Sequence, residues 1–223
     1  MSLEKSTKFK NIFFDFDGVL AESVNAKTEA FRELYLSYGK EIADKVVDHH
    51  INHGGVSRFE KFKIYHNQFL GVDLLQEGVN ILAQKFSDLV LEKVINSEEV
   101  KGSVDFLNKY HKSVKFWVIT GTPTDEMNII AKARQIEDYF IGIYGSPKNK
   151  KYWTEFLIEK HDLKREEILF LGDATTDYEA AQFSKLHFAL REHDENKSIF
   201  KDYKGLRFKD FLELNLAIEN NLS

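Results

Sequence analysis

The fold is decided by eight residues close to the start of the chain, Asn11-Ile12-Phe13-Phe14-Asp15-Phe16-Asp17-Gly18. Residues 11–16 are short, rich in aromatic side chains and apolar on both faces, which is typical of a strand buried in a parallel sheet. The Asp17-Gly18 pair is a turn signal, so the strand should end there. Two aspartates, Asp15 and Asp17, are therefore expected at the carboxyl end of a buried strand.

The pattern of apolar residues changes twice after this strand. From Val24 to about Ser97, apolar residues recur at spacings of three and four, which predicts a block of helices. Beyond Gly102, helices are predicted at 104–111, 125–135, 149–160 and 177–183, and strands at 114–120, 140–144, 167–171 and 186–190. Helices that separate strands too distant for hairpins indicate a parallel sheet.

The predicted fold class is therefore α/β, a three-layer Rossmann-like parallel sheet with an inserted all-helical domain. Residues 1–23 and 101–223 would form the α/β core, and residues 24–100 the helical insertion. The length of 223 residues suits one large domain or one domain with a modest insertion.

Composition excludes several classes of function. Hydrophobic residues make up 43% of the chain, which is enough for a core, and the net charge of −5 argues against nucleic-acid binding by phosphate neutralisation. The absence of cysteine excludes disulfides, a thiol nucleophile and thiolate metal sites. No apolar run is long enough for a membrane span, and residues 1–10 lack a signal-peptide pattern. A cytoplasmic protein is expected, and its oligomeric state is left open.

Polar residues follow the predicted strands at their carboxyl ends, where open parallel sheets bind ligands. The residues concerned are Asp15, Asp17, Thr120, Gly121, Lys148, Lys150, Asp173 and Asp177. Crowded carboxylates repel one another and require a cation. Oxygen ligands without thiolates favour a hard metal, Mg²⁺ before Ca²⁺.

This set of residues suits phosphoryl transfer. A phosphate ester carries its own negative charge, and two unit charges about 4 Å apart repel by roughly 4 kcal/mol at an effective dielectric constant of about 20. A metal on one side of the phosphoryl group and a lysine on the other would remove that barrier. Each motif alone has an ordinary structural explanation. Asp173 and Asp177, for example, could simply favour a helix N-terminus, but chance does not readily place all four motifs at strand ends.

Together these motifs resemble those of the haloacid dehalogenase-like hydrolase superfamily, over essentially the whole chain. The four matching segments are Asp15-Phe16-Asp17-Gly18-Val19-Leu20, Ile119-Thr120-Gly121-Thr122, a lysine within Gly145-Ser146-Pro147-Lys148-Asn149-Lys150, and Gly172-Asp173-Ala174-Thr175-Thr176-Asp177. The helical insertion is similar to the mobile cap of this superfamily. The resemblance is to the phosphatase branch, which includes phosphoglycolate phosphatase-like and sugar phosphomutase-like members.

The resemblance implies a role for each motif. Asp15 would be the nucleophile that forms an aspartyl-phosphate, and Asp17 would be the general acid and base. Mg²⁺ would be bound by Asp15, Asp173 and the backbone carbonyl of Asp17, with Asp177 supporting the metal or orienting the lysine. Thr120, Gly121 and Thr122 would bind the phosphoryl group. Both Lys148 and Lys150 match spacings seen in the superfamily, and the Pro-x-x-Lys pattern favours Lys150.

The predicted activity is Mg²⁺-dependent hydrolysis of a small phosphorylated metabolite. Asp17 argues against dehalogenases and phosphonate-cleaving members, which lack the second aspartate. Sugar phosphomutases, which carry a histidine where this chain has Lys27, remain an alternative, as does a non-catalytic phosphate-binding protein. Arg58 would face the distal group of the substrate or else lie on a solvated surface. His49, His50 and His53 form no metal-binding pattern and are assigned to a helix end or loop.

Overall fold

The computed structural model describes residues 8–221 and has a six-stranded sheet at its centre. The strands are β1 (Asn11–Phe14), β2 (Lys115–Pro123), β3 (Phe140–Ser146), β4 (Ile168–Gly172), β5 (His187–Arg191) and β6 (Leu206–Phe208). Their order across the sheet is β3-β2-β1-β4-β5-β6, and every neighbouring pair is parallel. The predicted α/β class with a parallel sheet is confirmed.

Helices cover both faces of the sheet, because alternate residues of the buried strands point to opposite sides. The helices are α5 (Ser103–Tyr110), α6 (Thr124–Ala133), α7 (Lys150–Lys160), α8 (Thr175–Phe183) and α9 (Phe211–Asn221). Phe14 packs on one side with α5, α6 and α9, and Phe13 packs on the other with α7 and α8. This arrangement produces the three predicted layers.

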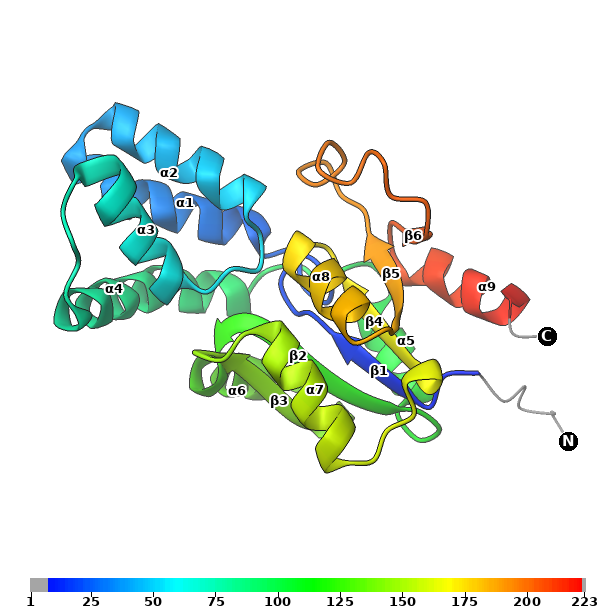
Figure 1. Cartoon of the computed structure of the whole chain (residues 1–223). Coiled ribbons are helices and arrows are strands. Elements are labelled where there is room, and N and C mark those ends of the chain that lie inside the picture. The colour runs from blue at the N-terminus through cyan, green and yellow to red at the C-terminus, as the bar shows by residue number, and fades with distance from the viewer. Residues whose placement is uncertain (1–7, 222–223) are drawn as a thin grey trace, which may run out of the picture.

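Four further helices lie between β1 and α5 and are grouped together to one side of the sheet (Figure 1). They are α1 (Val24–Tyr35), α2 (Lys40–Asn52), α3 (Arg58–Leu70) and α4 (Gln76–Ile95), and we call them the cap helices. Aromatic rings fill the space between them, with Phe31 in contact with Phe62, Tyr65 and Phe86. The all-helical character predicted for this segment is therefore observed, while its division from the core as a separate domain stays a prediction.

The strands and helices predicted from periodicity lie within a few residues of those observed. Two elements near the end of the chain, β6 and α9, were not predicted. β6 has only three residues, too few for a periodic pattern, and its place is set by pairing with β5, where Ala189 lies opposite Leu206. Residues 1–7 and 222–223, which the predicted core also includes, lie outside the described residues. Within residues 8–221 no helix combines the length and apolar character needed to cross a membrane.

The connections of the sheet create a crevice next to β1. From β1 the chain adds β2 and then β3 on one side, whereas β4, β5 and β6 extend the sheet on the other side. Loops that leave two neighbouring strands in opposite directions open a crevice at the carboxyl ends of those strands. In this sheet the crevice lies between the loops that follow β1 and β4, which carry Asp15 and Asp173.

Candidate active site

Asp15 lies at the centre of this crevice. Its backbone N–H donates to the carbonyl of Leu171 (2.9 Å), so the pairing of β1 with β4 continues one residue beyond β1 and holds the Asp15 backbone in place. The chain then turns at Gly18, whose φ of +74° is unfavourable for other residues. A Cβ at Gly18 would also lie 2.3 Å from Oδ2 of Asp173. Glycine therefore allows the loop after β1 to pass directly against Asp173.

Lys150 bridges two of the predicted aspartates. Its Nζ lies 2.6 Å from Oδ2 of Asp15 and 2.6 Å from Oδ1 of Asp177. Lys150 is the first residue of α7, and the side chain of Asn149 caps that helix by accepting from the N–H of Tyr152 (2.9 Å). Side chains in a first helical turn point back towards the N-terminus, so Lys150 reaches the edge of the sheet.

Lys148, the other candidate lysine, lies outside this cluster. Its Nζ is 4.8 Å from the centroid of the Tyr152 ring, and its side chain is exposed. Of the two candidates, the structure brings Lys150 to the aspartates.

Asp15, Asp173 and Asp177 form a buried group of hard oxygen donors. One carboxylate oxygen from each lies within 4.8 Å of the others. Asp177 also accepts from the N–H of Ala174 (3.1 Å), so it caps α8 as well as facing Lys150. Three carboxylates at this spacing, with no softer ligand among them, fit Mg²⁺. The Asp17 side chain is not part of this group, and the predicted contribution of its backbone carbonyl stays a prediction.

Lys150 does not balance the negative charge of the three carboxylates. Burial raises the pKa of the Asp15 carboxyl, Lys150 opposes that rise, and the neighbouring Asp173 adds to it. Burial likewise raises the pKa of Asp177 well above its ordinary value. Burial alone would lower the pKa of Lys150, but the two carboxylates beside it raise it, so this lysine stays protonated. A cation bound here would relieve the repulsion that remains between the carboxylates.

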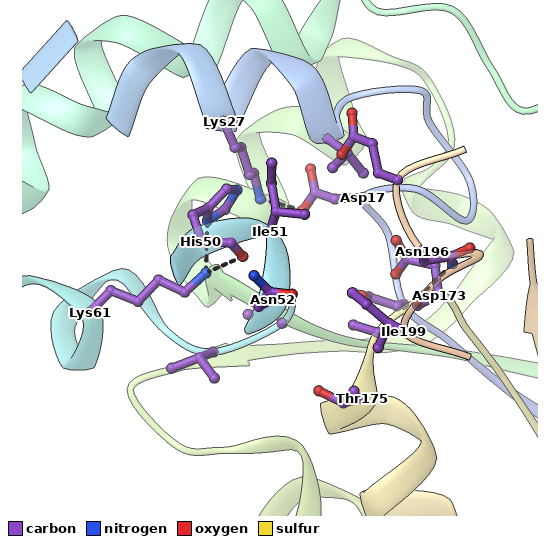
Figure 2. A pocket seen from close by; sticks show the side chains of 18 of the residues that line it. Asp17, Lys27, His50, Ile51, Asn52, Lys61, Asp173, Thr175, Asn196 and Ile199 are labelled. Carbon is purple, nitrogen blue, oxygen red and sulfur yellow. Dashed lines mark hydrogen bonds and ion pairs between the residues drawn. The ribbon is translucent and has the colours of Figure 1, made fainter. Parts of the chain in front are cut away.

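Asp17 is held separately, by the N-cap residue of α1 and by residues of α1 and β2. Lys27 forms an ion pair with it, Ser23 donates to Oδ1 (2.6 Å), and Thr122 donates to Oδ2 (3.1 Å). Burial would raise the pKa of Asp17, but Lys27 and the two hydroxyls lower it below its ordinary value. Figure 2 shows Lys27 reaching from a cap helix to Asp17.

The residues predicted to bind the phosphoryl group come from the end of β2. Thr120 is buried, its hydroxyl accepts from the N–H of Thr122 (3.2 Å), and it lines a cavity together with Gly121 and Lys150. The hydroxyl of Thr122 makes two hydrogen bonds: it donates to Asp17, and it accepts from Nζ of Lys27 (2.7 Å). Contact of these residues with a phosphoryl group stays a prediction.

Residues 53–57 form the loop between α2 and α3. This loop covers the side chains of the candidate site, and we call it the cap loop. The hydroxyl of Thr176 donates to the carbonyl of Gly54 (3.3 Å). Gly55 has a φ of +74°, and a Cβ there would lie 1.9 Å from Oγ1 of Thr176 and 3.3 Å from Nζ of Lys150. Beside this loop is a cavity of about 100 Å³ whose lining includes Asp15, Asp17 and Asp173. The cap loop therefore rests directly on the catalytic candidates.

Arg58 begins α3, next to the cap loop, and is buried rather than solvated. Its guanidinium forms a two-pronged ion pair with Glu126 of α6 (2.6 and 2.9 Å) and donates to the hydroxyl of Ser87 (2.7 Å). It lines the same cavity as Asp15, but its charge is matched by Glu126. Its predicted binding to substrate stays a prediction.

Two residues that sequence reasoning missed support Asp173. Nε2 of His193 lies 2.9 Å from Oδ2 of Asp173, and the side-chain amide of Asn196 donates to the backbone carbonyl of Asp173 (2.8 Å). Both follow β5 in a segment without helix or strand, so no spacing in the sequence pointed to them.

Known proteins resemble this chain in both sequence and fold. The family described as "Haloacid dehalogenase-like hydrolase" matches residues 12–190. A phosphoglycolate phosphatase of Photobacterium profundum is 27% identical over 188 residues, which are 80% of this chain and 81% of the relative.

Two solved structures show the same fold. A predicted phosphoglycolate phosphatase of Haemophilus somnus 129pt has a TM-score of 0.72 at 20% identity, over 95% of this chain and 98% of the other. CbbY of Rhodobacter sphaeroides, solved in complex with xylulose-(1,5)bisphosphate, has a TM-score of 0.73 at 17% identity, over 94% and 98%. The family match covers most of the chain and includes the strands whose ends carry Asp15, Thr120 and Asp173. The chain therefore belongs to the haloacid dehalogenase-like hydrolase family.

Proposed function

We propose that the chain is a phosphatase that hydrolyses a small phosphate monoester through an aspartyl-phosphate on Asp15. The observation that carries this proposal is the position of Asp15 in the crevice beside β1, buried between Lys150 and Asp173 with its backbone held by β4. A nucleophile, a lysine and further carboxylates converge there, as phosphoryl transfer requires.

The proposed reaction has two steps. In the first, a carboxylate oxygen of Asp15 attacks phosphorus, the bond to the ester oxygen breaks, and Asp17 donates a proton to that oxygen. Because Lys27 favours the ionised form of Asp17, the negative charge of the bound phosphate ester would have to raise the pKa of Asp17 before this step. In the second, Asp17 accepts a proton from water as the water attacks the aspartyl-phosphate, which releases inorganic phosphate and free Asp15. Thr120 and the N–H of Gly121 would orient the phosphoryl oxygens, and Lys150 would neutralise part of their charge.

Mg²⁺ would be held by Asp15, Asp173 and Asp177, whose oxygens are suitably close. When bound, it would supply positive charge to the phosphoryl oxygens and template their orientation. His193 and Asn196 would position Asp173 for this role, because ligands held by such contacts bind metals more tightly.

Metal removal tests this assignment. Phosphate release from an aryl phosphate should cease in excess EDTA and return when Mg²⁺ exceeds the chelator, because the carboxylates would repel the substrate without a cation. The measurement is a free-phosphate assay on the same protein before and after chelation. Undiminished release in EDTA would contradict the metal site.

The cap loop provides a second test. Gly55→Ala should lower kcat/KM by about tenfold or more, since the added methyl group would collide with Thr176 and lift the loop from the site. Gly71→Ala is a matched control, because Gly71 has a similar φ of +68° but nothing within 4 Å of the added Cβ. Both variants share the backbone strain, so equal losses of activity would show that strain, and not loop contact, is responsible.

The substrate is to be found by screening phosphorylated metabolites with Mg²⁺. Phosphoglycolate and sugar phosphates should come first, given the names of the relatives. The same screen separates the alternatives, because a phosphomutase would convert a sugar phosphate without releasing phosphate, and a non-catalytic protein would bind without change. Lys27 argues against a mutase, because the resemblance places it where the mutases carry a histidine, and it pairs with Asp17.

A further inference from the structure

A lysine is buried in the cap without an acidic partner. Lys61 of α3 is 1% exposed. Its Nζ donates to Nδ1 of His50 (2.7 Å) and to the carbonyl of His50 (3.4 Å), and it lies 5.5 Å from the centroid of the Phe31 ring. Among residues 8–221 no carboxylate forms an ion pair with it. Figure 2 shows Lys61 and His50 beside Lys27, on the cap side of Asp17.

Two other basic side chains that line the same cavity form ion pairs with carboxylates. Lys27 pairs with Asp17, and Arg58 pairs with Glu126. Lys61 lines this cavity as well, together with Phe31 and Phe86, so its amine stands in mostly apolar surroundings. One cationic group of the cavity lining is thus left without a negative partner among the described residues.

A buried Lys61 without a negative partner is unfavourable when no ligand is bound. A buried amine without a counter-ion is destabilising, and it tends to lose its proton. Burial, with a smaller effect of Lys27, lowers the pKa of Lys61 to about 7. Burial and the charge of Lys61 lower the pKa of His50 well below its ordinary value, so the imidazole is neutral. An anion placed here would supply the missing partner.

We infer that Lys61 and His50 form a subsite for a second anionic group of the substrate, at the cap end of the cavity that begins at Asp15. This inference rests on the proposed function and narrows it. The substrate is a phosphate monoester that also carries a carboxylate or a second phosphate, because Lys61 and His50 line the same cavity as Asp15. Arg58, which the sequence had suggested for the distal group, is already matched by Glu126.

The test compares three compounds with the same two-carbon skeleton. Ethyl phosphate has no second anion, phosphoglycolate has a carboxylate, and the bisphosphate of ethylene glycol has a second phosphate. Lys61→Met should lose at least about tenfold more kcat/KM on a two-anion compound than on ethyl phosphate, because it removes a charge-assisted hydrogen bond that only the second anion can make. The loss should appear in KM, because the contact is remote from the reacting phosphorus.

The matched control is Lys63→Met, which removes an exposed lysine from the same helix and should change none of the three values. Met is apolar and of similar length, so Lys61→Met should fold, and thermal unfolding checks this. If it does not fold, Lys61→Gln takes its place. A larger loss of kcat/KM on phosphoglycolate identifies the distal group as a carboxylate. A larger loss on the bisphosphate identifies it as a phosphate. Equal losses on all three compounds, or none, would overturn the subsite.

Binding separates this inference from the proposed function. Calorimetry on the Asp15→Asn variant, with and without Lys61→Met, measures the affinity for the same compounds without turnover. If the wild-type protein releases phosphate neither from these compounds nor from any phosphorylated metabolite of the screen, the proposed function fails. The subsite still stands in that case if the two-anion compounds bind more tightly than ethyl phosphate only when Lys61 is present, and it falls if they do not.

Discussion

The Asp15→Asn variant is expected to lose phosphate release by several orders of magnitude while keeping its fold. An amide is a poor nucleophile and cannot form the aspartyl-phosphate. The substitution is close to isosteric, its oxygen can still accept from the N–H of Phe16 (2.7 Å), and Lys150 keeps Asp177 as a partner. Free-phosphate assays measure the loss, and circular dichroism with thermal unfolding measures the fold.

A matched control for this variant is Asp202→Asn. It makes the same change at an exposed aspartate between β5 and β6 and should leave turnover unaltered. Acid-quenched wild-type protein should in addition carry a phosphoryl group on the peptide that contains Asp15. Near wild-type turnover by Asp15→Asn would show that the covalent mechanism is wrong, even if the protein proves to be a phosphatase.

Lys150→Met is expected to lower kcat/KM by at least about 10²-fold, because it removes a fixed positive charge beside the transferring group. It should also destabilise the protein when no metal is bound. Lys150 lies between two buried carboxylates, and removing one partner of a buried pair costs about 3–5 kcal/mol, less whatever these acids recover by taking up protons. Denaturant unfolding in EDTA and again in Mg²⁺ measures that cost, and Mg²⁺ should reduce it.

Lys148→Met is the control that the sequence itself offers, since both lysines match the motif. Its side chain is exposed beside Tyr152, so activity should stay within about twofold of wild type. Small and equal losses from both variants would mean that neither lysine contacts the phosphoryl group. A large loss from Lys148→Met alone would reverse the assignment of the two lysines.

Much of the fold and part of the site could be predicted from the sequence. The alternation of helices with apolar strands identified a parallel sheet, because periodicity is a local property that the chain carries wherever it packs. Strand ends such as Asp15 and Asp173 could be assigned to one edge, since parallel strands all present their carboxyl ends there. These two inferences were sufficient to bring the aspartates together without any knowledge of tertiary contacts.

Other features depended on packing between segments that are distant along the chain. The spacing of the motif allowed both Lys148 and Lys150, and the choice came from the start of α7 against the edge of the sheet. No local pattern pairs Arg58 with Glu126, which lies 68 residues further on.

The sequence by itself therefore determined the class of fold, the edge of the sheet that carries the site and the chemistry of its residues. Tertiary structure decided which charges are matched within residues 8–221: Lys150 by two aspartates, Lys27 by Asp17, and Lys61 by none. The physical reason is that periodicity and motif spacing act over a few residues, whereas the partner of a buried charge is set by which distant segments pack around it.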